Sequence, residues 1–585
     1  MRNIIGISAL YHDSACCILK DGKLYAAAQE ERFTRIKHDP SIPYNAFMYC
    51  LQQADLNITD IDMIAFYENP DKKRQRQLLN LEGGSGNILP ITLYNSEDIR
   101  KILRDDLGYE GPVTFIDHHL SHAASAFYFS GFGQSAILTV DGVGEWATTT
   151  YAYGDENGIT PLQEIIFPHS LGLLYSTITH YLGFEVNEGE YKVMGLAPYG
   201  NPTFLKQIKQ VIINEPDWGF HLNMDYFDFR QKDRMFTDAL VDLLQLPPRS
   251  RKDHLHQGHK DLAKSLQLVL EEILLDKINY LSTKTQSENL CLAGGVALNC
   301  VANGLIAREG PFKNVFIQPA ANDSGGAIGA AAEAYFAHHG KKPSSEQLKD
   351  VYLGGEYSNQ TIKMVLDSTK LIYQDFTSDR LKMLQSVAER LAGGAVIGWF
   401  QGRMEFGPRA LGSRSILADP RDPGMRDKVN ALIKKREGFR PFAPVVLEEN
   451  VFEHFDIRHL SPFMLETCNV ISPLNLPSIT HVDNSARVQT TSDSSNPMLA
   501  ILLKEFDEIT GCPILLNTSF NIKNEPIVCT PYDAIKCFIM TKLDYLVIGD
   551  FVVNRDDNSI ELLEFLIEQS YEVADAIDYN IYTFL

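Results

Sequence analysis

The first thirty residues alternate short apolar runs with polar turns. Apolar, β-favouring runs cover residues 4–10, 16–19 and 24–28, with turns at residues 12–14 and 21–22 between them. The same strand-turn-strand-turn-strand order returns over residues 136–167, and its first turn is at residues 141–144. A repeated unit of this kind predicts a duplicated α/β domain with a ligand cleft between its halves.

Two glycine-rich turns precede segments of helical composition. A short apolar strand at residues 289–292 runs into Gly294 and Gly295, and residues 296–307 then have helical composition. Residues 323–338 repeat this arrangement, with Asp323 or Ser324 as the N-cap. Free backbone N–H groups at such helix starts can meet phosphate or ribose oxygens. The glycine cluster at residues 83–86 follows no predicted strand, and we interpret it as a mobile loop.

The apolar pattern thins over residues 339–346, and we place a domain junction near residues 354–359. Strands expected at residues 395–400 and 514–516 indicate that the remainder is a second α/β domain. The sequence therefore predicts two domains, at residues 1–355 and 356–585.

Bulk properties exclude several classes of partner. The chain of 585 residues has a formal net charge of −22, which argues against nucleic acid as a partner. The nine cysteines include no CxxC pair, and the apolar run near the N-terminus is too short for a membrane span. We therefore expect a cytoplasmic protein that binds no membrane, for which a homo-oligomer is open.

Spacing points to a metal site. His118 and His122 are four residues apart in a segment of helical composition, so that both imidazoles project from one face. Asp141 in a hairpin turn and Asp323 at a helix start could reach the same cleft. Two histidines and two aspartates suit iron(II), manganese or zinc, and spacing does not choose among them. The alternative is that all four are ordinary helix, turn and cap residues.

The second domain carries a dense set of cations. Arg403, Arg409 and Arg414 alternate with Gly, Pro and Phe, and Lys434, Lys435, Arg436 and Arg440 follow. Guanidinium groups hold phosphate or carboxylate through paired hydrogen bonds, which favours an anion site, although salt bridges to the surplus acidic residues are the alternative. Asn517 to Asn521 lie just past an expected strand end, where α/β folds bind ligands.

Together these segments resemble the two-domain O-carbamoyltransferases of antibiotic and nodulation-factor biosynthesis. The resemblance runs nearly end to end, except for the acidic tail beyond Asp550. Its motifs are GIS at residues 6–8 with His12-Asp13, EERFTR at 30–35, the segment 118–126, VDG at 140–142, EYKVMGLA at 190–197, LAGGVALN at 292–299, FGPRALG at 406–412, FRPFAP at 439–444, RVQT at 487–490 and LNTSFN at 516–521.

This resemblance implies an N-terminal domain of the actin/Hsp70/sugar-kinase class, Kae1-like, followed by a YrdC-like domain. In the family the first domain holds ATP and a metal, usually iron, which implies Fe(II) or another divalent ion here. The implied metal ligands are His118, His122, Asp141 and Asp323. The implied contacts of ATP, with Mg as its partner ion, are Lys192, Gly294, Gly295, Val296 and Asn299.

The YrdC-like domain of the family takes carbamoyl phosphate. The resemblance implies that Arg409, Arg414, Lys434, Arg440, Arg487, Asn517 and Ser519 bind it, with Lys434 and Arg440 also catalytic. Carbamate released there would react with ATP to give carbamoyl-adenylate, and the carbamoyl group would pass to a hydroxyl of a small natural product. His12 is then expected to act as general base or orienter, and Asp225 to contact the acceptor.

Two other functions fit parts of this sequence. The same domain types occur in tRNA adenosine carbamoylation, against which the net charge and the fusion of both domains argue. A non-enzymatic, ATP-regulated scaffold of the Hsp70 class would leave the basic set of the second domain without a purpose. Neither the acceptor nor the role of the tail at residues 551–585 follows from the sequence.

Overall fold

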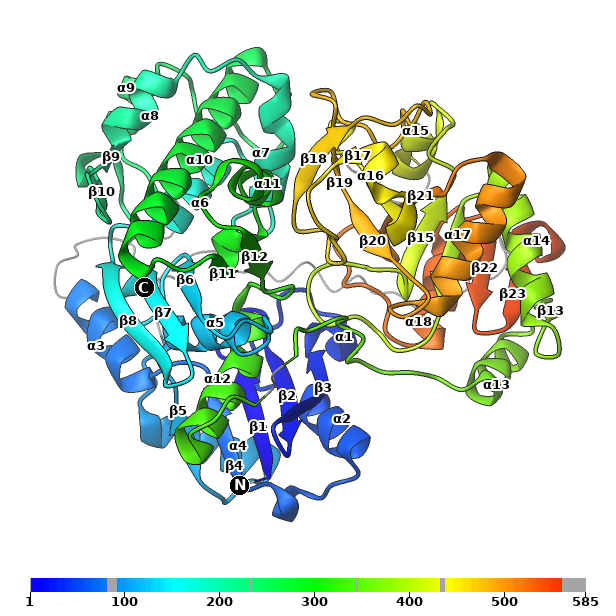
Figure 1. Cartoon of the computed structure of the whole chain (residues 1–585), viewed down its shortest axis with the longest axis horizontal. Helices are drawn as coiled ribbons and strands as arrows, with labels where there is room; N and C mark the ends of the chain where they lie inside the picture. Colours follow the sequence, from blue (N-terminus) through cyan, green and yellow to red (C-terminus); the bar gives the residue numbers. More distant parts are fainter. Residues whose placement is uncertain (1, 82–91, 231–233, 344–345, 432–436, 560–585) are drawn as a thin grey trace. The chain divides into compact units, whose positions relative to one another are not determined.

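The computed structural model of the chain describes residues 2–81, 92–230, 234–343, 346–431 and 437–559 (Figure 1). Lys434, the glycine cluster at residues 83–86 and the tail from residue 560 lie outside the described residues. The described chain forms two compact units. Unit 1 comprises residues 2–30 and 38–348, and unit 2 comprises the short segment Glu31–Lys37 together with the chain from Lys349 onward. The chain thus changes unit near the boundary predicted after residue 355, but it also does so twice near its N-terminus.

Unit 1 contains two five-stranded sheets of the same topology. Their orders are β3-β2-β1-β4-β5 and β8-β7-β6-β11-β12. In each sheet the first three strands form an antiparallel meander, and the last two run parallel to the first. This repetition confirms the predicted duplicated α/β domain. The strands are β1 Asn3–Ser8, β2 Ala15–Lys20, β3 Lys23–Gln29, β4 Met63–Phe66, β5 Val113–Phe115, β6 Ser135–Val140, β7 Ala147–Asp155, β8 Gly158–Ile166, β11 Asn289–Ala293 and β12 Asn314–Ile317.

Two helices lie between these sheets and pack against each other (Figure 1). The helix α5 (His118–Phe127) covers β6 and β11, whereas α12 (Asp323–His339) covers β1 and β2. Gly329 permits the close crossing, since a Cβ atom there would lie 1.7 Å from the carbonyl oxygen of Ser121. The first turns of both helices are thereby brought together.

The other helices of unit 1 surround the two sheets. The longest, α10 (Gln257–Thr285), packs on β6 and on four neighbouring helices, and α2 (Tyr44–Ala54) packs on β2 and β3. None of the described helices combines the length and apolar character needed to cross a membrane. The remaining elements are α3 Pro70–Leu81, α4 Ser96–Leu107, α6 Leu171–Tyr181, α7 Glu190–Leu196, α8 Leu205–Val211, α9 Asp238–Leu244, α11 Cys300–Glu309 and the hairpin of β9 Ile212–Asn214 with β10 Phe220–Leu222.

Unit 2 is built on an eight-stranded mixed sheet of order β13-β23-β22-β14-β15-β21-β16-β20. Its apolar core includes fully buried Trp399. Phe551–Asn554, assigned above to a separate tail, forms β23 and pairs with β22. The strands are β13 Gln374–Asp375, β14 Ile397–Phe400, β15 Arg414–Ala418, β16 Ala443–Leu447, β20 Gln489–Thr491, β21 Ile514–Ser519, β22 Tyr545–Ile548 and β23.

Helices and a small second sheet complete unit 2. The helices α14 and α17 pack against each other, and α18 packs on β14 and β22. The elements are α1 Glu31–Thr34, α13 Asn359–Thr369, α14 Arg380–Ala392, α15 Met425–Val429, α16 Val451–His454, α17 Pro497–Thr510, α18 Pro531–Met540 and the sheet of β17 Phe455–Asp456, β18 Thr467–Val470 and β19 Ser485–Arg487.

Candidate metal centre and anion site

Four side chains converge inside unit 1, between the first turns of α5 and α12. Ligand atoms of His118, His122, Asp141 and Asp323 all lie within 4.8 Å of one another. His118 Nε2 is 3.0 Å from Asp141 Oδ2 and 3.1 Å from His122 Nε2, and both histidines lie within 3.6 Å of Asp323 Oδ1. The structure therefore brings together the set that the sequence predicts as metal ligands.

The local fold explains this convergence. The spacing of four residues places both imidazoles on one face of α5. Asp141 follows the last residue of β6, and Asp323 is the first residue of α12. All but Asp141 are at most 1% exposed, so the site is enclosed by elements rather than by loops.

The charges of these side chains shift one another's pKa values. Burial lowers the pKa of His122, but hydrogen bonds and charges from Asp141 and Asp323 outweigh it and raise the pKa to about 9. Burial raises the pKa of Asp141, and the two histidines reverse this and hold it well below its usual value. Two carboxylates at this separation need compensating positive charge, from protons or from a cation.

The donor set fits a divalent transition metal. Two imidazole nitrogens and two carboxylate oxygens suit iron(II), manganese or zinc. The second carboxylate oxygen of Asp323 is buried and has no hydrogen-bond partner among the described residues, so it could also reach an ion. The neighbouring His119 does not join the set, because its Nδ1 lies 2.6 Å from the Thr139 hydroxyl.

One buried carboxylate was not predicted and binds the helix that carries both histidines. The predicted cap position of α5, Asp117, makes no side-chain cap hydrogen bond. Glu145 instead accepts the backbone N–H of His118 at 2.9 Å and that of Asn69 at 2.6 Å. It lies four residues after Asp141 and is 5% exposed. Only this short spacing after a metal-ligand candidate could have indicated its role.

His12 lies beside the cluster, in the turn between β1 and β2. Its Nδ1 is 3.9 Å from Asp323 Oδ2 and 3.0 Å from Asp13 Oδ2. The other oxygen of Asp13 is 2.7 Å from His38 Nδ1, so one carboxylate links two imidazoles. Burial lowers the pKa of His12, but Asp323 and Asp13 outweigh it and raise the pKa to about 9. Asp13 has a left-handed φ of 55°, which directs its side chain between both rings.

The glycine turn after β11 touches the same cluster. Gly294 has a φ of 91°, and a Cβ atom there would lie 2.3 Å from the carbonyl oxygen of Val140. The next residue, Gly295, donates its N–H to Asp141 Oδ1 at 2.8 Å. Val296 lies in the following 3-10 turn, Gly295–Leu298. The predicted nucleotide turn and the histidine-aspartate cluster are therefore parts of one site.

Two other predicted nucleotide residues have different surroundings. The Asn299 amide caps α11 by accepting the N–H of Ala302 at 3.0 Å, and it exchanges two hydrogen bonds with Gln267 of α10. Its side chain is thus committed to local structure rather than directed at a ligand. Lys192 is partly exposed in the first turn of α7.

Strand register gathers polar residues at one end of the neighbouring strands β21, β16 and β20, which is called the sheet edge below. Asn517 in β21 pairs with Ala443, the first residue of β16, three residues after Arg440. On the other side of β16, β20 begins at Gln489, two residues after Arg487, and Ser519 ends β21. Since β16 and β20 start where β21 ends, Arg440, Arg487, Asn517 and Ser519 share this edge. The two guanidinium groups and the Ser519 hydroxyl can surround an anion, whereas the amide N–H groups of Asn517 are bound within the protein.

The loop that carries Arg409 is fixed by buried polar groups. One oxygen of the Glu405 carboxylate accepts three backbone N–H groups, from Leu411 at 2.8 Å, Ser413 at 2.8 Å and Arg414 at 3.2 Å. The Asn517 amide joins the loop to the sheet edge by donating to Ala410 at 3.3 Å and to the Gln489 side chain at 2.7 Å. Neither Glu405 nor Gln489 was among the predicted site residues.

Two predicted site residues, Arg414 and Asp225, have surroundings in the structure that differ from the prediction. The Arg414 guanidinium, predicted to bind substrate, is fully buried and donates to the carbonyl groups of Gln401, Gly402, Ser413 and Gly355. It therefore holds the chain around β15 together instead of facing a ligand. Asp225 is exposed in a 3-10 turn, where its N–H bonds Asn223, and no described contact links its carboxylate to the cluster.

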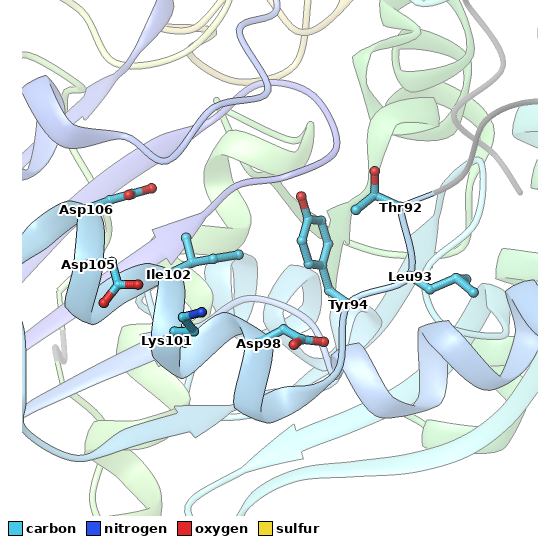
Figure 2. Close-up of a pocket in the computed structure, with 8 residues that line it drawn as sticks. All are labelled: Thr92, Leu93, Tyr94, Asp98, Lys101, Ile102, Asp105 and Asp106. Atoms are coloured by element: carbon cyan, nitrogen blue, oxygen red, sulfur yellow. The ribbon is translucent and has the colours of Figure 1, made fainter.

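A surface hollow of about 410 Å³ lies elsewhere in unit 1 (Figure 2). It is lined by Thr92, Leu93, Tyr94, Asp98, Lys101, Ile102, Asp105 and Asp106, from α4 and the residues before it. Three carboxylates and one ammonium make its wall acidic. None of its lining residues belongs to the metal cluster or to the anion edge, so it adds nothing to the candidate chemistry.

Comparison with known proteins places this chain in a family. The chain matches the family of the carbamoyltransferase N-terminus over residues 3–332 and that of the carbamoyltransferase C-terminus over residues 388–555. The protein belongs to the carbamoyltransferase family and is a transferase. Its C-terminal match includes β23, so the family fold continues past Asp550.

Several relatives match nearly all or about half of the chain. An uncharacterized protein of Synechocystis sp. is 46% identical over 95% of this chain and 97% of its own. Nodulation protein NolNO of Sinorhizobium fredii is 40% identical, covering 94% and 80%. The 3'-hydroxymethylcephem-O-carbamoyltransferase of Amycolatopsis lactamdurans is 38% identical over 45% of this chain and 48% of its own. Among solved structures, HypF of T. kodakarensis is similar at 13% identity and a TM-score of 0.31, covering 59% and 49%.

Proposed function

We propose that this protein is an ATP-dependent O-carbamoyltransferase that modifies a hydroxyl group of a small natural product. Membership of the family and the cephem-modifying relative support the carbamoyl donor and the hydroxyl acceptor. The observation that carries the proposal is the presence of two different sites in one chain. Unit 1 joins a glycine turn to a histidine-aspartate cluster, and unit 2 gathers cations at a sheet edge.

The first reaction belongs to unit 2 in this proposal. Carbamoyl phosphate would bind at the sheet edge, where Arg409, Arg440 and Arg487 neutralise the phosphate and the charge that develops on the displaced oxygen. Ser519 supplies a hydroxyl group at the same edge, and the Asn517 amide holds the Arg409 loop beside it. Addition of water releases inorganic phosphate and leaves carbamate.

The second and third reactions belong to unit 1. Carbamate attacks the α-phosphate of ATP, so that pyrophosphate leaves and carbamoyl-adenylate forms. The backbone at Gly294 and Gly295 would accommodate the nucleotide. A metal ion held by His118, His122, Asp141 and Asp323, in the family iron(II), would supply Lewis-acid polarisation of bound oxygen atoms.

Transfer to the acceptor completes the cycle. The acceptor hydroxyl attacks the carbamoyl carbon, AMP leaves, and the hydroxyl proton must be removed. His12 would orient that hydroxyl and, in its neutral form, receive the proton; with a pKa of about 9 that form is favoured as the pH rises. Asp13 fixes the ring by binding Nδ1. Enclosure of the cluster limits competing hydrolysis of the adenylate.

The test is an acceptor-free assay with paired detection of pyrophosphate and phosphate. We expect both products to depend on both ATP and carbamoyl phosphate when iron and magnesium are supplied. Arg440→Ala should lower both rates roughly 100-fold, while Arg458→Ala, at an exposed arginine of the same unit, should leave them unchanged. Absence of pyrophosphate even with candidate hydroxyl acceptors present would exclude the adenylate route.

A further inference from the structure

The segment Glu31–Lys37 lies between two stretches of unit 1 in the sequence but belongs to unit 2 in the structure. It follows β3 directly and contains the one-turn helix α1. Its side chains are not spread over the surface of unit 2. Three of them, Arg32, Phe33 and Arg35, contact the loop that carries Arg409 or the residues 526–529.

Two arginines of this segment bind backbone carbonyl groups of unit 2. Arg32, which is 4% exposed, donates from Nη2 to the carbonyl of Gly407 at 2.8 Å. Arg35 donates to Pro526 and to Ile527, both at 2.7 Å. Between them Phe33 packs on a small apolar cluster of Met404, Ala410, Ile527 and Cys529. The segment thus joins the Arg409 loop to residues 526–529.

Gly407 lies in this loop on the N-terminal side of Arg409. Its φ is 111°, a conformation that glycine adopts without strain, and it lies two residues before Arg409. Glu405 and Asn517 restrain the loop at Ala410 and beyond. Arg32 supplies a hydrogen bond on the other side of Arg409. There it adds to the restraint from Phe406, which donates its N–H to the carbonyl of Val351 at 2.8 Å.

We propose that Arg32 is a positioning residue of the carbamoyl-phosphate site, which the segment Glu31–Lys37 completes by fixing the Arg409 loop. This inference rests on the proposed function, because that function assigns the phosphate to Arg409 and its neighbours. Arg32 acts through the backbone of Gly407 and needs no contact with the substrate. The charge-assisted hydrogen bond to a carbonyl is the kind whose loss frees a loop.

The experiment compares three variants of the full-length protein. Arg32→Ala should raise KM for carbamoyl phosphate roughly 10-fold or more, with KM for ATP changed by less than about twofold, and Arg32→Lys should recover part of the loss. Arg35→Ala is the matched control, since it removes carbonyl hydrogen bonds from the same segment without touching Gly407. It should lower the unfolding temperature as much as Arg32→Ala does while leaving KM for carbamoyl phosphate within about twofold.

Calorimetric binding of inorganic phosphate to the same proteins separates this inference from the proposed function. If the wild type binds phosphate and Arg32→Ala weakens it selectively, the inference holds even where no adenylate forms. Equal phosphate affinity in folded wild type and Arg32→Ala would overturn it. Equal rises in both KM values, an equal rise in Arg35→Ala, or no phosphate binding by the wild type would do the same.

Discussion

The two candidate sites are held in place in different ways. In unit 1 the four side chains project from the first two turns of α5, the end of β6 and the start of α12, so that regular elements position every ligand. In unit 2 the cations lie just outside strands or on a loop, and the loop that carries Arg409 makes hydrogen bonds with Glu405, Asn517 and Arg32. Substitution of a ligand residue should therefore have a large effect on the first site. Substitution of a residue that holds the loop should have a large effect on the second.

The largest effect should come from removing a ligand of the cluster. Asp323→Ala is expected to abolish metal retention and to lower carbamoyl transfer roughly 1,000-fold, because one of two carboxylates is lost from an enclosed site. Metal content and product formation measure this. His119→Gln, in the same helix but bonded to Thr139, should retain the metal. Equal metal content in wild type and Asp323→Ala would contradict the assignment.

The next largest effect is expected on stability, from removing the Glu405 carboxylate that holds the Arg409 loop. Glu405→Ala leaves three backbone N–H groups without their buried acceptor and should reduce the free energy of unfolding by about 3 kcal/mol. Phosphate affinity should fall with it, because the Arg409 loop loses its restraint. Chemical denaturation and calorimetry measure the two changes. A stable variant that binds phosphate normally would show that the loop is fixed by other contacts.

The cluster of unit 1 is also supported by a hydrogen bond, which Glu145 accepts from the backbone N–H of His118. Glu145→Ala removes the acceptor for the His118 N–H, and we expect the metal affinity to fall roughly 10- to 100-fold. Competition with a chelator measures the affinity directly. Glu145→Gln, which keeps one carbonyl acceptor, should recover most of it. If both variants bind metal like the wild type, helix packing alone positions His118.

The smallest effect is expected at Asp225, which the structure places in an exposed turn. Asp225→Ala should change the free energy of unfolding by less than about 0.5 kcal/mol. It should also leave acceptor-free pyrophosphate release unchanged within about twofold. Thermal unfolding and the paired product assay test this. A large loss of acceptor-free activity would give Asp225 a place in the first two reactions that the described contacts do not indicate.

Regular periodicity explains what the sequence could predict. Helical spacing indicates His118 and His122 as candidate ligands, and a turn after a strand indicates Asp141. The repeated meander predicts the duplication. Buried hydrogen bonding between distant segments leaves no such pattern. Arg414 lies only five residues after Arg409 in the same basic segment, yet its guanidinium is buried among carbonyl groups. Likewise, nothing in the composition of Glu31–Lys37 indicates that it folds with unit 2.

The duplicated topology gives the cluster of unit 1 an approximate twofold axis. The helix α5 follows β5 as α12 follows β12, and the turn after β1 corresponds to the turn after β6. Corresponding positions therefore carry His118 and His122 opposite Asp323, and His12 with Asp13 opposite Asp141. Symmetry accounts for four elements meeting at one point. The departure from symmetry places imidazole and carboxylate donors in one cluster, which identical halves would not provide.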